Sequence, residues 1–151
     1  MAARHHLELL DSVVDAYSAS SFGYGCAGPQ SMPRCKMLVS PTASPVPRVL
    51  LAEDSRPCQE FVRIVLKQAG FAVDIVGNGA EAIEALSKTD YALVLMDCLM
   101  PIMGGAETTR LIRSGATNAR NPEIPIIAIT ANAFQENAET CKLAGMNDYI
   151  S

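Results

Sequence analysis

An uninterrupted apolar run, Tyr91–Met96, ends on the carboxylate of Asp97, and a proline and two glycines follow within residues 101–105. A run of this kind is typical of a strand buried on both faces, as the strands of parallel sheets are. Proline and glycine interrupt regular structure. The pattern therefore predicts that Asp97 lies at the carboxyl end of a buried strand. In open α/β sheets, ligands bind at that edge.

Two other apolar runs also end on polar side chains. The run Val49–Ala52 precedes the acidic pair Glu53 and Asp54, and the run Ile126–Ile129 precedes Thr130. The carboxyl ends of parallel strands lie along one edge of their sheet. We therefore expect three carboxylates and one hydroxyl to converge on a single site.

Strands and helices alternate from Arg48 onward. Strands are predicted at residues 49–52, 72–76, 91–96, 126–129 and from 148 to the end of the chain. Helical patterns are centred on residues 61–69 and 82–86 and cover 106–113 and 133–143. This alternation predicts a parallel sheet with helices on both faces.

The first of these helices has signals at both ends. Ser55 can cap it, Pro57 can occupy its first turn, and Gly70 can end it. Its apolar stripe is predicted to consist of Phe61, Val62, Val65, Leu66 and Ala69. In the next connection, Asn78 and Gly79 predict a turn.

Residues 1–47 differ from the rest of the chain in composition and in hydrophobic periodicity. Apolar residues recur at helical spacing between Leu7 and Tyr17, which predicts a short amphipathic helix. Residues 18–47 are rich in Ser, Gly and Pro and are typical of a linker. We therefore divide the chain into an N-terminal helix with a linker, 1–47, and an α/β domain, 48–151.

Composition narrows the classes of partner and location. The net charge of −4 argues against nucleic acid as a direct partner. The five cysteines are scattered without C-x-x-C spacing, as in proteins of the reducing cytoplasm. No apolar run reaches the ~20 residues of a membrane helix. We interpret Cys98 as a small apolar packing residue rather than a redox centre.

The acids Glu53, Asp54 and Asp97 suit a hard divalent cation. Mg²⁺ prefers oxygen ligands and is usually held by one or two carboxylates together with a phosphate. With the cation bound, a phosphoryl group could approach Asp97, whose carboxylate could act as the nucleophile. Thr130 could then donate a hydrogen bond to a phosphoryl oxygen. Any one of these acids alone could be a strand-end cap, but three together indicate a site.

Residues 48–151 resemble the receiver domain of two-component response regulators, and most closely the receivers attached to hybrid histidine kinases. The matching segments are residues 49–55, 78–82, 95–105, 126–133 and 144–151. The resemblance implies a flavodoxin-like, doubly wound, five-stranded parallel sheet of order 2-1-3-4-5. It also implies a phosphoryl donor, which is a histidine kinase or a histidine phosphotransfer domain.

The resemblance assigns roles to individual residues. Asp97 would be the phosphoacceptor, and Glu53 and Asp54 the acidic metal pair. The backbone carbonyl of Leu99 would be a further Mg²⁺ ligand. Thr130 would be the switch hydroxyl and Tyr149 the switch aromatic. In the family, phosphorylation draws the hydroxyl inward and the aromatic follows, which remodels an interaction surface.

The sequence departs from the family pattern in three places. Gly104 stands where Asp is commoner, and Ser55 replaces a frequent Asn. The family expects a Lys directly after Ser151, followed by a last helix, so we expect a domain truncated before that helix. The N-terminal apolar stripe, between Leu7 and Tyr17, could dock in its place.

Two other functions stay open at this stage. A phosphatase-like hydrolase of the haloacid dehalogenase type also uses an aspartyl phosphate, but it carries a second acid two residues after the nucleophile. That position is Leu99, which cannot transfer a proton. The other alternative is an interaction module that keeps the receiver fold but cannot be phosphorylated. The absence of the expected Lys favours this hypothesis.

Overall fold

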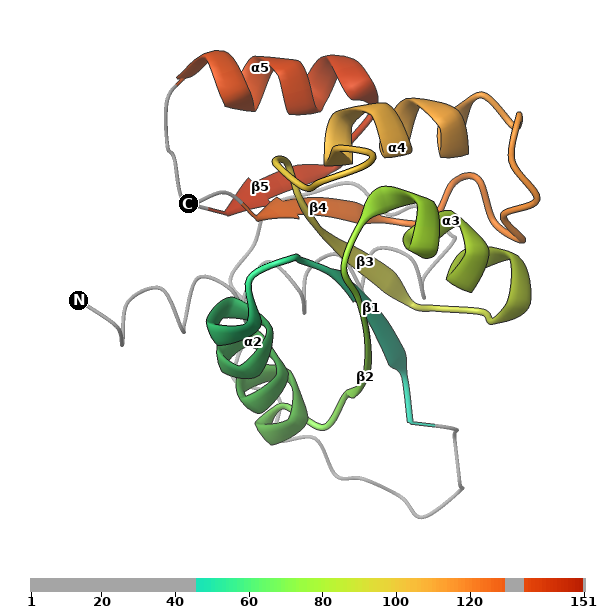
Figure 1. The fold of residues 1–151 in the computed structure, drawn as a ribbon. Coiled ribbons are helices and arrows are strands. Elements are labelled where there is room, and N and C mark those ends of the chain that lie inside the picture. Colours follow the sequence, from blue (N-terminus) through green and yellow to red (C-terminus); the bar gives the residue numbers. More distant parts are fainter. Residues whose placement is uncertain (1–45, 130–134, 151) are drawn as a thin grey trace, which may run out of the picture.

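Five parallel strands form one sheet in the computed structural model, which describes residues 46–129 and 135–150. The strands are β1 (Arg48–Ala52), β2 (Ala72–Val76), β3 (Leu93–Asp97), β4 (Ile126–Ile129) and β5 (Asp148–Ile150). The helices are α2 (Arg56–Gln68), α3 (Gly79–Lys88), α4 (Gly105–Arg113) and α5 (Gln135–Ala144). The order β2-β1-β3-β4-β5 confirms the predicted doubly wound topology (Figure 1). The helix predicted near the N-terminus and its docking lie outside the described residues.

Both faces of the sheet are buried, each in its own hydrophobic cluster. Successive side chains along a strand point to opposite faces, so each strand contributes to both clusters. In β1, Val49 and Leu51 belong to one hydrophobic cluster, and Leu50 and Ala52 belong to the other. All four are fully buried, and β3 alternates in the same way. These runs are continuously apolar because each face has its own core.

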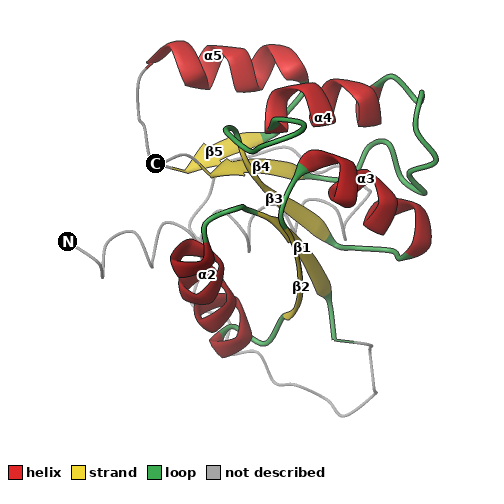
Figure 2. Cartoon of the chain, in the orientation of Figure 1, coloured by secondary structure: helices red, strands yellow, loops and turns green. Residues whose placement is uncertain are grey.

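The helices are divided unequally between the two faces (Figure 2). On one face, α2 packs through Val62, Val65 and Leu66. On the other face lie α3, α4 and α5, and their buried residues include Leu86, Ile112 and Cys141. No helix in the described part of the chain combines the length and the apolarity needed to cross a membrane.

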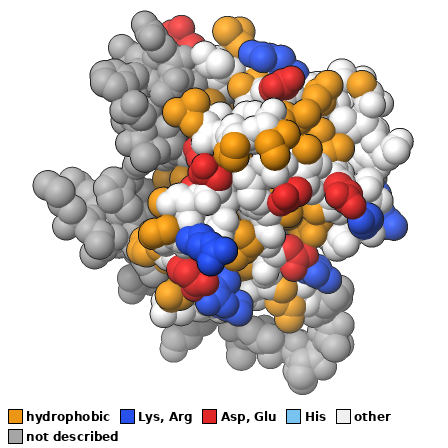
Figure 3. All heavy atoms as spheres, viewed as in Figure 1, with side chains coloured by type: hydrophobic (Ala, Val, Ile, Leu, Met, Phe, Trp, Pro, Cys, Tyr) orange, Lys and Arg blue, Asp and Glu red, His pale blue; other side chains and the backbone are white. Residues whose placement is uncertain are grey.

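The apolar stripe of α2 is narrower than predicted. Phe61 is 45% exposed and Ala69 is also exposed, so the stripe is wrong at both ends. Helical periodicity identifies the face of a helix but not how far the neighbouring sheet extends beneath it. Acidic and basic side chains lie among the exposed apolar ones over α2 (Figure 3), where Arg63 pairs with Glu60 at 2.5 Å.

The start of α2 also differs in detail from the prediction. Ser55 occupies the N-cap position, but its side chain makes no capping hydrogen bond. Pro57 lies in the first turn, as expected. At the other end, Gly70 has a φ of +88°, which confirms its predicted role as the helix stop.

Asn78 caps α3 rather than forming a free-standing turn with Gly79. Its Oδ1 accepts a hydrogen bond from the Glu81 N–H at 3.0 Å, and its Nδ2 donates to Glu81 Oε1 at 3.0 Å. The first of these bonds satisfies a backbone donor that the first helical turn leaves without a partner, and the second joins the two side chains. Strand β3 begins at Leu93 rather than at Tyr91, whose hydroxyl instead donates to Asp74 at 2.9 Å.

Candidate metal and phosphoacceptor site

Strand register brings the predicted acids to one edge of the sheet. Ala52, at the end of β1, pairs with Met96 of β3, so Glu53 and Asp97 are the next residues along these two neighbouring strands. Asp97 in turn pairs with Ile129, the last residue of β4. Three central strands therefore end side by side at the carboxyl edge.

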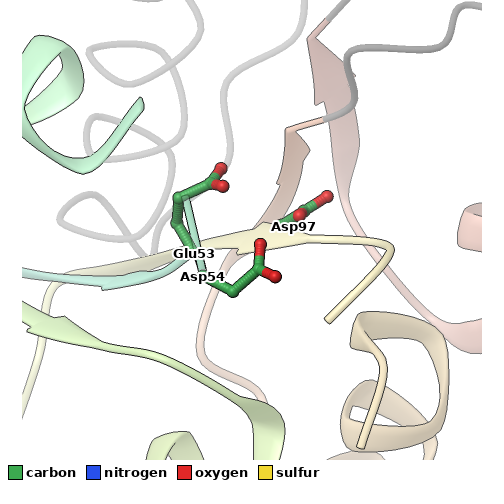
Figure 4. A group of neighbouring side chains, drawn as sticks. All are labelled: Glu53, Asp54 and Asp97. Atoms are coloured by element: carbon green, nitrogen blue, oxygen red, sulfur yellow. The ribbon is translucent and has the colours of Figure 1, made fainter. Parts of the chain in front are cut away.

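The three carboxylates form a compact cluster. Each of Glu53, Asp54 and Asp97 offers a carboxylate oxygen, and these oxygens lie within 4.8 Å of one another. Figure 4 shows Glu53 and Asp54 at the end of β1, with Asp97 beside them at the end of β3. Glu53 is only 5% exposed, Asp97 is half-buried and Asp54 is exposed. The cluster is therefore open to solvent on the side of Asp54.

Glu53 is held in place by the turn that leads into α2. The Ser55 N–H donates to Glu53 Oε1 at 3.1 Å, and Gln59 Nε2 donates to the Glu53 carbonyl at 2.6 Å. Burial raises the pKa of the Glu53 carboxyl, and the charges of Asp97 and Asp54 raise it further, while the Ser55 N–H acts in the opposite direction. The fold thus holds an acid where its charged form is disfavoured.

Asp97 experiences the same competition. Burial is the main cause that raises its pKa, the charge of Asp54 adds to it, and the N–H groups of Leu99 and Cys98 oppose it. The Leu99 N–H donates to Asp97 Oδ1 at 3.2 Å. The loop after β3 therefore turns back toward the carboxylate that precedes it.

The start of α4 packs directly under Asp97. The Gly105 N–H donates to the Cys98 carbonyl at 3.1 Å. A Cβ atom on Gly105 would lie 2.3 Å from the Asp97 carbonyl oxygen, closer than real Cβ contacts come. Only glycine allows this approach, so Gly105 sets the position of the loop that carries Cys98 and Leu99.

The donor set fits a hard divalent cation. Among the described residues, no ion pair involves Glu53, Asp54 or Asp97. Clustered carboxylates without a cation repel one another, in line with the raised pKa values. Carboxylate oxygens at a solvent-open edge suit Mg²⁺, which retains several waters. Glu53, Asp54 and Asp97 could hold such an ion.

The other predicted site residues are less closely placed. Thr130 lies outside the described residues, directly after Ile129. Tyr149 lies in β5, is 41% exposed, and has its ring centre 6.0 Å from Lys142 Nζ. The hydrolase hypothesis requires an acid two positions after Asp97, and that position is Leu99. The Leu99 side chain is 71% exposed.

Sequence reasoning predicted neither of two long-range contacts, one at the opposite edge of the sheet and one beside the site. Arg113 of α4 donates to the Gly145 carbonyl at 3.0 Å and to Asn147 Oδ1 at 2.9 Å. Cys98 Sγ lies 3.0 Å from Cys141 Sγ, and burial first, then Cys141, raises the pKa of the Cys98 thiol to about 12. Both contacts join segments more than 30 positions apart, so no local signal in the sequence could have found them.

Comparison with known proteins identifies the family. Residues 49–151 match the family model of the response regulator receiver domain. This chain belongs to that family. The receiver is 38% identical over 128 residues to histidine kinase 5 of Arabidopsis thaliana, covering 70% of this chain and 14% of the kinase. It is 34% identical over 113 residues to the hybrid signal transduction histidine kinase B of Dictyostelium discoideum, covering 70% of this chain and 6% of the kinase. The chain thus spans a small part of these relatives.

A solved receiver gives the same picture. The receiver domain of a sensor histidine kinase from Pseudomonas aeruginosa superposes with a TM-score of 0.63 at 38% identity, covering 70% of this chain and 84% of that one. That crystal structure has a magnesium ion coordinated in its active site cleft. The fold, the family and its place in two-component signalling agree with the resemblance identified in the sequence.

Proposed function

We propose that this receiver accepts a phosphoryl group on Asp97 from a phosphorylated histidine of a partner, with Mg²⁺ held by Glu53, Asp54 and Asp97. The observation that carries the proposal is the cluster itself, whose three ligand oxygens lie within 4.8 Å at the carboxyl edge of the sheet. The magnesium ion in the receiver from Pseudomonas aeruginosa supports it. The partner would be a histidine kinase or a histidine phosphotransfer domain.

The chemistry proposed for Asp97 is nucleophilic. A carboxylate oxygen forms the new O–P bond, the N–P bond of the phosphohistidine breaks, and the imidazole leaves with the electron pair. When bound, Mg²⁺ would neutralise phosphoryl charge and add the Leu99 carbonyl to its ligands. The Leu99 N–H holds one oxygen of Asp97 at 3.2 Å, which orients the carboxylate before attack.

The output of the receiver would be a change of surface. In this proposal, Thr130 donates a hydrogen bond to a phosphoryl oxygen on Asp97, and Tyr149 moves inward. The exposed position of Tyr149 in β5 supports the proposal, because the ring has room to change its burial. The surface that changes would be the face formed by α5 and its flanking strands.

Phosphate labelling tests the assignment of Asp97. With Mg²⁺ and acetyl phosphate, mass spectrometry should detect one labile phosphate, which Asp97→Asn abolishes because the amide keeps the shape but removes the nucleophile. The matched control is Asp90→Asn, since Asp90 is an exposed aspartate paired with Arg120 away from the cluster. Equal labelling of Asp97→Asn and the parent would refute the assignment. A parent that is never labelled would instead support a phosphorylation-incompetent interaction module.

A further inference from the structure

Two thiols meet beside the phosphoacceptor. Cys98 Sγ, in the loop after β3, lies 3.0 Å from Cys141 Sγ of α5. Sulfur atoms in a disulfide are ~2.05 Å apart, so about 1 Å of approach would bond them. Cys141 is only 3% exposed and Cys98 is half-buried, so Cys98 is the thiol that an oxidant reaches first. Because the raised pKa keeps the Cys98 thiol protonated near neutral pH, its oxidation is slow.

The backbones on both sides of this contact are anchored. The Cys98 carbonyl accepts from the Gly105 N–H at 3.1 Å, and the Cys141 carbonyl accepts from the Met146 N–H at 3.1 Å. Helix α5 packs against α4 and β5. The two sulfurs thus face each other from a loop and a helix that hydrogen bonds hold in place. The fold therefore places the two thiols next to each other before any oxidation.

We infer that Cys98 and Cys141 form a reversible intrachain disulfide that tethers the phosphoacceptor loop to α5. With a peroxide as oxidant, one thiol is oxidised to a sulfenic acid with release of one water. The second thiol then attacks that sulfur, and the S–S bond forms as a second water leaves. Two thiols are thereby oxidised and one peroxide is reduced to two waters. A dithiol reductant reverses the step by thiol–disulfide exchange.

The tether would affect the receiver because of where its ends lie. Cys98 stands between Asp97 and Leu99, and α5 borders the surface proposed to change on phosphorylation. Closing the bond must shift the loop, the helix or both by a fraction of the ~1 Å gap. This consequence rests on the proposed function of Asp97, whereas the disulfide itself does not.

Peptide mapping tests the disulfide. The full chain, reduced and then treated with hydrogen peroxide, should give a Cys98–Cys141 cross-linked peptide in a non-reducing digest of the monomer. The matched control is Cys58→Ser, since Cys58 is an exposed thiol on α2, on the opposite face of the sheet. This variant should form the link as the parent does, while Cys141→Ala should not. Free Cys98 and Cys141 after oxidation of other cysteines, or a link from Cys98 to a different cysteine, would overturn the inference.

Two further readouts separate the tether from the proposed function. Hydrogen–deuterium exchange in α5 should slow in the oxidised parent and in Cys58→Ser, but not in Cys141→Ala; unchanged exchange would overturn the tether. Labelling of Asp97 by acetyl phosphate should fall about tenfold on oxidation and recover with dithiothreitol, since a full 1 Å displacement of reacting groups can cost about a hundredfold and the expected shift is a fraction of that. Equal labelling of the two forms would overturn the coupling. If the reduced parent is not labelled at all, that result counts against the proposed function alone. The disulfide and its effect on α5 are still tested by peptide mapping and by hydrogen–deuterium exchange.

Discussion

The backbone N–H of Ser55 donates a hydrogen bond to Oε1 of Glu53 at 3.1 Å, so the turn into α2 binds the most buried carboxylate of the cluster. The same hydrogen bond lowers the pKa that burial and the neighbouring acids raise. Glu53 is therefore a carboxylate whose charge is tolerated rather than favoured in the absence of a cation.

Glu53→Gln and Asp54→Asn should each weaken Mg²⁺ binding. Each change replaces an anionic ligand with a neutral one, and we expect the dissociation constant measured by calorimetry to rise by about tenfold or more, that is ~1.4 kcal/mol. Glu60→Gln is the matched control, because Glu60 is an exposed glutamate on α2. Unchanged affinity in both site variants would show that these acids are only caps.

Without metal, Glu53→Gln should stabilise the receiver near neutral pH. The pKa values of Glu53 and Asp97 are raised above their ordinary 4.5 and 3.8, so the folded state holds more protons than the unfolded state between the ordinary and the raised values. These two groups therefore lower stability as pH rises, fully so above the raised values and not at all below the ordinary ones.

Denaturant unfolding in EDTA, from about pH 4 to 8, measures this difference. The gain in the free energy of unfolding from Glu53→Gln should be largest near pH 7 and should shrink as the pH falls toward 4.5, the ordinary value for Glu53. The amide can still accept the Ser55 hydrogen bond, so that contact is preserved. A gain that does not vary with pH would mean that ionisation of Glu53 is not its cause.

Gly105→Ala should destabilise the receiver although Gly105 lies in a helix. Replacing a helical glycine by alanine ordinarily stabilises by ~0.5–1 kcal/mol. Here the new Cβ would lie 2.3 Å from the Asp97 carbonyl oxygen. Overpacking of this kind costs about 1–3 kcal/mol. This steric cost exceeds the gain from the helical alanine, so the free energy of unfolding should fall.

The matched control for this prediction is Gly77→Ala. The nearest atom to a Cβ at Gly77 is Glu81 Oε2 at 3.8 Å, an ordinary contact. Thermal unfolding should show a lower melting temperature for Gly105→Ala only. Equal melting temperatures for the two variants would mean that the start of α4 can shift away from Asp97 at little cost.

Arg113→Met should loosen the turn that precedes β5. Arg113 donates hydrogen bonds to the Gly145 carbonyl and to Asn147 Oδ1. Asn147 Oδ1 also accepts a hydrogen bond from the Ile126 N–H at 2.9 Å. Asn147 Oδ1 keeps the Ile126 N–H as its partner and water can reach the exposed Gly145 carbonyl, so the lost hydrogen bonds should cost about 0.5–1.5 kcal/mol. Arg110→Met, at an exposed arginine on the same helix, should change the free energy of unfolding by much less. Similar losses in both variants would argue that only helix charge matters.

The sequence was most informative where local rules decide the structure. Strands β2 and β4 lie at the predicted residues 72–76 and 126–129, because turn residues bound short apolar runs. The grouping of Glu53, Asp54 and Asp97 could also be predicted, since parallel strands end along one edge. The roles of these residues remain proposals, as do those of Thr130, Tyr149 and the Leu99 carbonyl.

The remaining features depend on how helices pack. Phe61 belongs to a helical stripe by period, yet it lies beyond the part of α2 that the sheet covers. The contact between Cys98 and Cys141 and the bonds of Arg113 depend on the placement of α4 and α5 relative to each other. Sequence spacing does not determine that placement, so these contacts were missed.

The strand order also has a consequence for how the chain is made. β1 is the first of these strands to leave the ribosome, yet it ends up between β2 and β3. Once α2 and β2 have followed it, one edge of β1 can pair, while its other edge must wait for α3 and β3. Glu53 and Asp54 are therefore synthesised before the third acid of the cluster, which arrives only with residue 97. A nascent receiver therefore gains Asp97 in the same step in which β3 pairs with the open edge of β1.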